Sequence, residues 1–382
     1  MKNFTFTTTP KIIFEAGAAK RLGEVVAPRM KRPIFLTDKG LIDAGLVSPV
    51  IGSFRAASLD VKLYDSVQAD PPVARVHDAI EAARQHDADG VVALGGGSSM
   101  DTAKLVAVLA KSDQSLADIY GMDKVTAARL PLVVAPTTAG TGSEVTSISV
   151  VTSETDEKVG VVDDALYPDV AVLDPETTIG LPRNVTAATG VDAMVHAIEA
   201  YTNVHKKNPV SDALAREALS LLAGNIVAAC ERPRDMTARG NMLLGSMLAG
   251  QAFANSPVGA VHALAYPLGG IFHVPHGLSN SLMLEPVLKF NSEKAAPLYA
   301  ELGSVLGLDA AGTDEARSAA FIARMVEIVE ATGVERRLSQ VGVSHNDLPK
   351  MAEDAMNVQR LLVNNPREVT YDDALRMYTE VL

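Results

Sequence analysis

The chain has 382 residues, 47% of them hydrophobic, which is enough for two hydrophobic cores. Its formal net charge of −12 excludes a nucleic-acid-binding surface, because phosphate binding requires clustered lysines and arginines. The single cysteine, Cys230, cannot form an intramolecular disulfide, so we expect a reducing, cytoplasmic compartment. Neither a signal-peptide pattern nor a run of about 18 apolar residues occurs, so we expect no membrane association.

The first ten residues have the pattern of an edge strand. Phe4 and Phe6 alternate with Thr5 and Thr7, and the segment ends at Pro10. An exposed edge strand can pair with its counterpart in a second subunit. The pattern therefore predicts a homodimer.

Between residues 33 and 173, short apolar runs alternate with longer segments of helical period. This alternation is typical of a doubly wound parallel sheet with crossover helices, an α/β fold. The predicted strands are Ile34–Thr37, Val61–Tyr64, Gly90–Leu94 and Leu132–Ala135, and the predicted helices between them are Gly40–Phe54, Pro72–His86 and Met100–Ala110.

After Pro182 the strand pattern stops. Long segments rich in alanine and leucine, such as Ser211–Cys230 and Thr237–Phe253, have helical spacing. The best boundary is the Pro/Gly-containing turn at 175–182. We therefore predict an α/β domain over residues 1–180 and an all-α domain over residues 181–382.

Two loops that follow predicted strands have the composition of a phosphate-binding site. Residues 95–99, Gly-Gly-Gly-Ser-Ser, precede a helix whose free N–H groups and dipole favour an anion. Residues 136–144 form a second loop rich in threonine and glycine. Since ligands bind open α/β sheets at the carboxyl ends of strands, both loops are expected to face one extended cofactor. The alternatives are an ordinary turn with a serine N-cap and a hydrogen-bonded threonine turn.

Asp38 directly follows the strand at 34–37. A carboxylate there accepts hydrogen bonds from an adenosine ribose and repels a 2′-phosphate, which favours NAD over NADP. Lys39 beside it weakens this preference, and an aspartate in this position is also a common helix cap.

His196, His262, His273 and His276 are four of the five histidines that lie between residues 196 and 276. Asp192 and His196 are four residues apart in a segment of helical period, which places a carboxylate and an imidazole on one helix face. Their neighbours are apolar, and a bound cation would offset the cost of burying the carboxylate. Three imidazoles and a carboxylate suit Fe²⁺ and Zn²⁺ equally, while hydrogen-bonded core or surface histidines are the alternative.

Four motifs resemble those of the iron-containing (group III) alcohol dehydrogenase family, which includes lactaldehyde reductase and 1,3-propanediol dehydrogenase. They occur in the family's order: GGGSSMDTAK at 95–104, PTTAGTGSE at 136–144, ATGVDAMVHAIEAY at 188–201, and HALAYPLGG with PHG between 262 and 277. The resemblance spans nearly the whole chain. It implies an N-terminal dinucleotide-binding domain, a helical metal-binding and substrate domain, and the cofactors NAD and Fe²⁺.

The resemblance also implies roles for individual residues. The metal ligands would be Asp192, His196, His262 and His276. The cofactor-binding residues would be Asp38, Asp70, Gly96, Gly97, Ser98, Thr137, Thr138, Thr141 and Lys158.

One position departs from the family. Many members have a histidine four residues after the third ligand, often assigned to proton relay, where this chain has Tyr266. Tyr266 or His273 would have to take that role. Phe253 and Tyr266 lie close in sequence to the metal segments and are candidates for the substrate pocket, although helix aromatics more often lie in a core.

The expected function is a metal-dependent alcohol dehydrogenase that transfers a hydride between a metal-stabilised alkoxide and NAD, or reduces an aldehyde or ketone in reverse. An alternative in the same family is a hydroxyacid–oxoacid transhydrogenase or a 4-hydroxybutyrate-type dehydrogenase, which a basic pocket residue would favour. Lys158 and Arg183 are the candidates for that residue. A more remote alternative is an inactive metal- or nucleotide-binding protein.

Overall fold

The computed structural model describes residues 3–154, 158–309 and 311–382. The chain divides into two compact units. One runs from Thr8 to Gly180 and is the α/β unit; the other contains Leu181–Leu382 with the N-terminal residues up to Thr7 and is the helical unit.

The α/β unit is built on a six-stranded parallel sheet, in the described residues, with the order β1-β9-β6-β4-β2-β3. Every residue of β2, β4, β6 and β9 is buried, as expected of parallel strands covered on both faces. The strands are β1 (Ile12–Phe14), β2 (Pro33–Leu36), β3 (Lys62–Tyr64), β4 (Gly90–Gly95), β6 (Leu132–Pro136) and β9 (Val170–Leu173).

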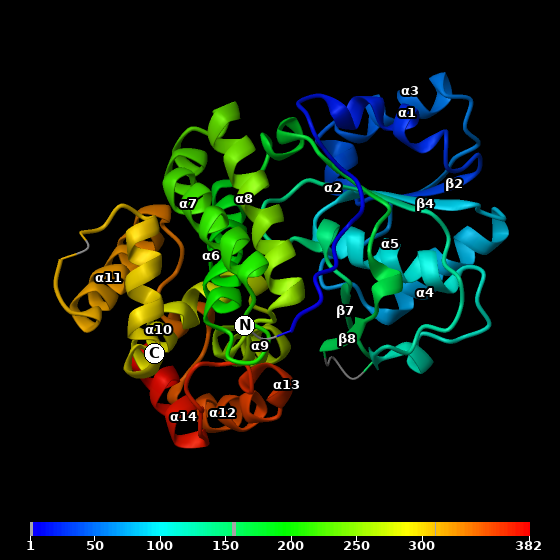
Figure 1. Cartoon of the computed structure of the whole chain (residues 1–382). Coiled ribbons are helices and arrows are strands. Elements are labelled where there is room, and N and C mark those ends of the chain that lie inside the picture. The colour runs from blue at the N-terminus through cyan, green and yellow to red at the C-terminus, as the bar shows by residue number, and fades with distance from the viewer. Residues whose placement is uncertain (1–2, 155–157, 310) are drawn as a thin grey trace. The chain divides into compact units, whose positions relative to one another are not determined.

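Helices cover both faces of this sheet (Figure 1). α1 and α3 pack on one face, where Leu22 and Phe54 share a core with Phe35 and Leu94 of the strands. α4 and α5 pack on the other face. The doubly wound α/β fold is therefore confirmed. The helices are α1 (Leu22–Val26), α2 (Lys39–Asp43), α3 (Val47–Ala56), α4 (Val73–Gln85) and α5 (Gly97–Leu109), with 3₁₀ helices η1 (Ala18–Arg21), η2 (Ala117–Ile119), η3 (Ser143–Val145), η4 (Asp164–Leu166) and η5 (Pro175–Thr178).

Two local features of this unit differ from the sequence-based expectation. The single helix predicted at 40–54 is two helices, because Gly45 adopts a left-handed conformation (φ 77°) that ends α2 and starts a turn. A second, three-stranded sheet with the order β5-β8-β7 was not predicted. Its strands are β5 (Gly121–Met122), β7 (Ile148–Thr152) and β8 (Lys158–Val162).

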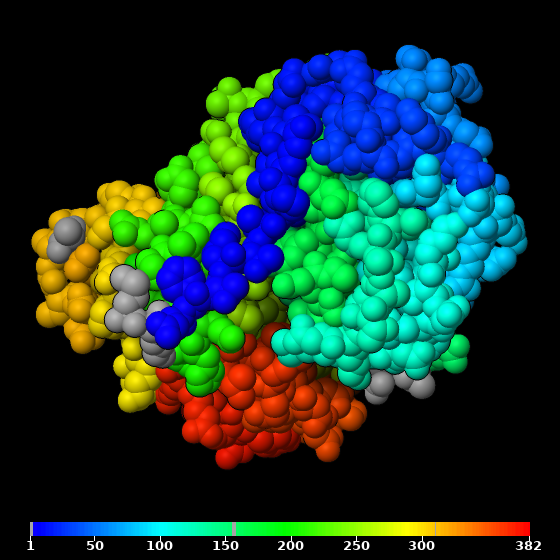
Figure 2. All heavy atoms as spheres, turned by 45° about the vertical axis from the view of Figure 1, so that its right-hand side comes forward, coloured from blue at the N-terminus to red at the C-terminus, as the bar shows by residue number. Residues whose placement is uncertain are grey.

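The predicted N-terminal edge strand is wrong, since residues 3–9 form no strand. The side-chain amide of Asn255 accepts a hydrogen bond from the Thr7 N–H (2.8 Å) and donates one to its carbonyl (2.9 Å), so these backbone groups need no partner strand. The segment lies as a dark-blue strip on the surface (Figure 2), and the first strand is β1. The homodimer inferred from that strand stays a prediction.

The helical unit is a bundle around α6, which is buried on nearly all sides and packs against α7, α8 and α10. A helix of this kind forms the centre of a core. Its helices are α6 (Arg183–Thr202), α7 (Pro209–Glu231), α8 (Met236–Asn255), α9 (Ala260–Phe272), α10 (His276–Val305), α11 (Asp314–Thr332), α12 (Leu348–Met356), α13 (Gln359–Leu362) and α14 (Tyr371–Glu380), with 3₁₀ helices η6 (Leu338–Val341) and η7 (His345–Asp347).

Helix α7 is long and apolar enough to cross a membrane by length and composition alone. It packs along α6 and α8, and its buried residues recur at helical spacing along one face. This arrangement is typical of a helix that belongs to a helical core.

Candidate functional site

Helix α6 presents Asp192 and His196 one turn apart on the same face. Both are buried, with exposed fractions of 1% and 4%. His196 is also covered by Phe253 of α8, whose ring stacks on the imidazole at 4.2 Å between centroids. Phe253 therefore shields this side of the His196 imidazole from water.

Two further histidines meet this pair. His262 lies in the first turn of α9, and His276 is the first residue of α10. The Nε2 atoms of His196, His262 and His276 lie 3.9, 3.8 and 3.6 Å from Asp192 Oδ1, and one donor atom from each of the four residues lies within 4.8 Å of the others. We call these four residues the metal cluster. The His276 side chain is 42% exposed, so the cluster is open on that side.

The charge state of Asp192 suits a cation. Burial raises the pKa of this carboxyl, but attraction to His196, His276 and His262 and a hydrogen bond from Asn280 outweigh burial and lower its pKa below the usual value. Asp192 is therefore ionised at neutral pH. A carboxylate facing three imidazoles is a donor set for a divalent transition metal.

Glu199 orients His262 from behind. Its Oε2 lies 2.6 Å from His262 Nδ1, and its Oε1 accepts a hydrogen bond from the backbone N–H of Val261 at 2.7 Å. A carboxylate at Nδ1 places the ring proton there and leaves the Nε2 lone pair facing the cluster. Sequence reasoning assigned Glu199 no role, although its position three residues after His196 places it near the same helix face.

Asn280 is a second contact that sequence reasoning missed. Its Nδ2 donates a 2.6 Å hydrogen bond to Asp192 Oδ1 and lies 3.2 Å from His276 Nε2, while its own Oδ1 is buried without a hydrogen-bond partner. The amide thus places N–H groups against two atoms that would ligate a cation. Its spacing of four residues from His276 was the available signal.

The open side of the cluster carries Tyr266 and Arg360. The Tyr266 ring lies 6.4 Å from the His276 imidazole, and its hydroxyl accepts a 2.9 Å hydrogen bond from Arg360 Nη2. His273, the other predicted proton-relay residue, caps the end of α9 in a left-handed conformation (φ 54°) and is exposed. Of the two candidates, Tyr266 is the one with a ring contact to the cluster.

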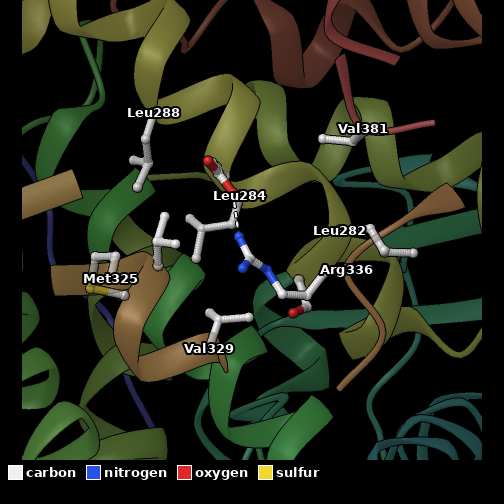
Figure 3. Close-up of a pocket in the computed structure, with 10 residues that line it drawn as sticks. Leu282, Leu284, Leu288, Met325, Val329, Arg336 and Val381 are labelled. Carbon is white, nitrogen blue, oxygen red and sulfur yellow. Dashed lines mark hydrogen bonds and ion pairs between the residues drawn. The ribbon is translucent and has the colours of Figure 1, made fainter. Parts of the chain in front are cut away.

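A hollow lies between α10 and α11, next to Arg336 and Val381 (Figure 3). Its lining is mostly aliphatic. Its charged residues, Glu285 and Arg336, are paired with each other at 2.7 Å. Because these groups are already satisfied and no cluster residue lines the hollow, it does not extend the metal cluster.

In the α/β unit, the glycine-rich segment at residues 95–99, called the glycine loop below, leads directly into α5. The helix begins at Gly97, its N-cap is Gly96, and no side chain caps it, so the serine-cap alternative is wrong. The first N–H groups of a helix have no intrahelical acceptor, and here they are available to an anion. The loop follows β4 beside β2, where the chain reverses its direction of travel across the sheet, the usual ligand position in such folds.

The loop at residues 136–144, called the threonine loop, packs against the glycine loop. A Cβ on Gly97 would lie 2.8 Å from Thr141 Cγ2, and one on Gly96 would lie 3.4 Å from Thr138 Cγ2. Thr137 is buried and its N–H donates to the Gly95 carbonyl at 3.0 Å. A side chain at position 97 would therefore force Thr141 to shift, whereas a Cβ at position 96 would make an ordinary contact.

Asp70, Ser98 and Lys158, which lie far apart in sequence, form one connected group. Lys158 Nζ lies 2.6 Å from an Asp70 carboxylate oxygen and donates to Thr152 Oγ1 at 2.9 Å, while the Asp70 N–H donates to Ser98 Oγ at 3.2 Å. Asp70 has a left-handed backbone (φ 50°), which is uncommon for a residue with a side chain and concentrates at functional sites.

Asp38 caps α2. Its Oδ1 accepts a hydrogen bond from the Leu41 N–H at 3.1 Å, as the helix-cap alternative predicted. The residue follows β2 at the same edge of the sheet as the glycine loop, because β2 and β4 are parallel neighbours. Its position is compatible with both roles.

A buried ionic group lies beneath the two loops. Lys104 is fully buried and donates to Thr146 Oγ1 (3.1 Å) and to a backbone carbonyl, and Asp101 accepts a 2.6 Å hydrogen bond from Ser143 Oγ. Burial lowers the pKa of Lys104 to about 8 and raises the pKa of Glu144 to about 7. These contacts tie α5 to the threonine loop.

Comparison with protein families matches both parts of the chain. The model described as iron-containing alcohol dehydrogenase matches residues 9–175, and the C-terminal model of the Fe-containing alcohol dehydrogenase family matches residues 186–382. Long-chain-alcohol dehydrogenase 1 of Geobacillus thermodenitrificans is 38% identical over 363 residues, covering 94% of this chain and 90% of that protein.

Solved structures agree with these matches. A 1,3-propanediol oxidoreductase superimposes with a TM-score of 0.96 at 32% identity, covering all of both chains. Sulfoacetaldehyde reductase from Bifidobacterium kashiwanohense, solved in complex with NAD⁺, gives a TM-score of 0.90 at 29% identity, covering 100% of this chain and 99% of that one.

Proposed function

We propose that this chain, which belongs to the iron-containing alcohol dehydrogenase family, is an NAD-dependent oxidoreductase that interconverts small alcohols and their aldehydes or ketones. The observation that carries the proposal is the metal cluster, in which four donor atoms from three helices converge within 4.8 Å. No purely structural need explains a buried ionised carboxylate surrounded by three imidazoles.

The donor set fits a divalent metal ion. The ion would be held by Asp192, His196, His262 and His276. The Asn280 amide already contacts the ligand atoms of two of these residues, Asp192 and His276. We propose Fe²⁺, following the family name, and the same donors also suit Zn²⁺. When bound, such an ion acts as a Lewis acid that stabilises negative charge on the substrate oxygen.

The loops of the α/β unit would hold NAD. The N-terminus of α5, with Gly96, Gly97 and Ser98, suits the pyrophosphate, and Asp38 suits the adenosine ribose. Thr137, Thr138 and Thr141 would line the cofactor beside Gly97, and Asp70 and Lys158 would border it. NAD supplies the hydride acceptor, and one structural relative was solved with NAD⁺.

The chain's own side chains then prepare the substrate oxygen and its proton. Glu199 holds His262 with its Nε2 lone pair toward the cluster, and Phe253 keeps water from His196. Arg360 can only donate, so it occupies an acceptor position of the Tyr266 hydroxyl and leaves the Tyr266 O–H free to donate to a substrate. We therefore propose Tyr266 as the proton-relay residue.

The location of the protein also remains a proposal. Its only cysteine, Cys230, is buried and unpaired, which is typical of a reducing compartment. We propose the cytoplasm.

The test combines metal content with NADH oxidation. After a chelator has removed the metal, the protein should not oxidise NADH with any aldehyde of a panel. Added Fe²⁺ should restore the rate of NADH oxidation. His276→Ala should lose bound metal and rate together, whereas His205→Ala, at an exposed histidine outside the cluster, should keep both. If the metal-loaded protein oxidises NADH with no aldehyde of the panel, the dehydrogenase proposal is rejected and an inactive binding protein is favoured.

A further inference from the structure

Arg360 is a charged residue near the open side of the metal cluster. It lies in α13, and its guanidinium carbon is 5.7 Å from the centre of the Tyr266 ring. That ring is in turn 6.4 Å from the imidazole of His276. The guanidinium of Arg360 and the imidazole of His276 therefore both lie beside the ring of Tyr266.

The guanidinium of Arg360 has donors to spare. It carries five N–H groups, of which the hydrogen bond to Tyr266 uses one. In the described part of the chain no carboxylate lies within ion-pair distance of Arg360, so its other N–H groups can donate to a ligand.

The backbone that carries Arg360 is anchored. Asn364 Nδ2 donates to the Arg360 carbonyl at 3.2 Å and to the Val258 carbonyl at 3.1 Å, which ties α13 to the loop preceding α9. Both α13 and the Tyr266 side chain are thus fixed to the helix that carries His262. A binding group held in this way keeps its distance to the cluster.

We propose that Arg360 binds an anionic group at the far end of the substrate, so that the preferred substrates are short aldehydes, and the corresponding alcohols, that carry a carboxylate or sulfonate. Guanidinium binds such groups with two parallel hydrogen bonds, a geometry that a neutral alcohol chain cannot use. This inference rests on the proposed function for the reaction at the cluster. It assigns the basic residue that sequence reasoning sought at Lys158 and Arg183.

The test compares charged and neutral aldehydes with the metal-loaded enzyme. Succinate semialdehyde offers a carboxylate, sulfoacetaldehyde a sulfonate, and butanal neither. We expect a higher kcat/KM for at least one anionic aldehyde than for butanal, and Arg360→Gln should raise the KM for it about tenfold to a hundredfold. The KM for butanal should stay unchanged, while kcat should fall alike for both kinds of aldehyde, because the hydrogen bond from Arg360 to the Tyr266 hydroxyl is lost with either substrate. Added salt should raise the KM for the anionic substrate in the wild type only.

Arg324→Gln is the matched control, because Arg324 is an exposed arginine on α11 paired with Glu327, and its loss should change neither substrate. Turnover of butanal without a preference for either anionic aldehyde would overturn this inference and leave the proposed function standing. An equal rise in KM for charged and neutral substrates in Arg360→Gln would also overturn it. No turnover of any substrate would overturn the proposed function and this inference with it.

Discussion

Replacing Glu199 by glutamine tests how the metal cluster is held together. Both carboxylate oxygens accept hydrogen bonds, one from the Val261 N–H at 2.7 Å and one from His262 Nδ1 at 2.6 Å. Glutamine has only one side-chain oxygen, so one of these two donors must face an NH₂ group.

Either orientation of the glutamine has a cost. If its oxygen faces Val261, His262 must move its proton to Nε2, which removes the lone pair that faces the cluster. If its oxygen faces His262, the N–H of Val261 stays buried without an acceptor, at about 1–3 kcal/mol. Losing such an outer contact weakens metal binding about tenfold to a hundredfold.

The assay is metal affinity measured by competition with a chelator, together with urea unfolding of the metal-free protein. Glu199→Gln should lose affinity, stability or both, by the amounts given above. Glu217→Gln, at an exposed glutamate on α7, is the control and should change neither. Wild-type affinity and wild-type stability together in Glu199→Gln would refute the role of this carboxylate.

Three further substitutions test the α/β unit. Burial raises the pKa of Glu144 to about 7 from an ordinary 4.5, so ionising this carboxyl lowers the free energy of unfolding as the pH rises between those values. Glu144→Gln should therefore stabilise the protein by roughly 3 kcal/mol near pH 8 and hardly at all near pH 4. Urea unfolding at the two pH values measures this difference. Gly97→Ala places a Cβ 2.8 Å from Thr141 and should weaken NADH binding, measured by fluorescence, whereas Gly52→Ala, where a Cβ meets no atom, should not. Asp38→Gly should lower the NAD-over-NADP ratio of kcat/KM about tenfold with little loss of stability, and an unchanged ratio would remove Asp38 from the ribose site.

The sequence predicted the fold where its signals are local and repeated. Apolar runs between turns located β2, β4 and β6, because strands buried on both faces consist almost entirely of apolar residues. The N-terminal strand failed because its alternation of phenylalanine and threonine carries no information about Asn255, 248 residues away from Thr7, which takes up the backbone hydrogen bonds. The two-residue strand β5 is too short to leave a pattern.

The same limit applies to the candidate site. Asp192 and His196 are visible from a spacing of four on one helix, whereas His262 and His276 join them only through the packing of α9 and α10 against α6. Arg360 had no sequence signal at all, since 94 residues separate it from Tyr266 and nothing local marks their contact.

The metal content of a single ligand variant tests the central claim most directly. Asp192→Asn keeps the size of the side chain but removes the only carboxylate of the cluster. After reconstitution with Fe²⁺ and desalting, this variant should therefore retain little metal. The wild type should hold one ion per chain and oxidise NADH in proportion to its metal content. Full metal retention in Asp192→Asn, or wild-type NADH oxidation without metal, would contradict the account.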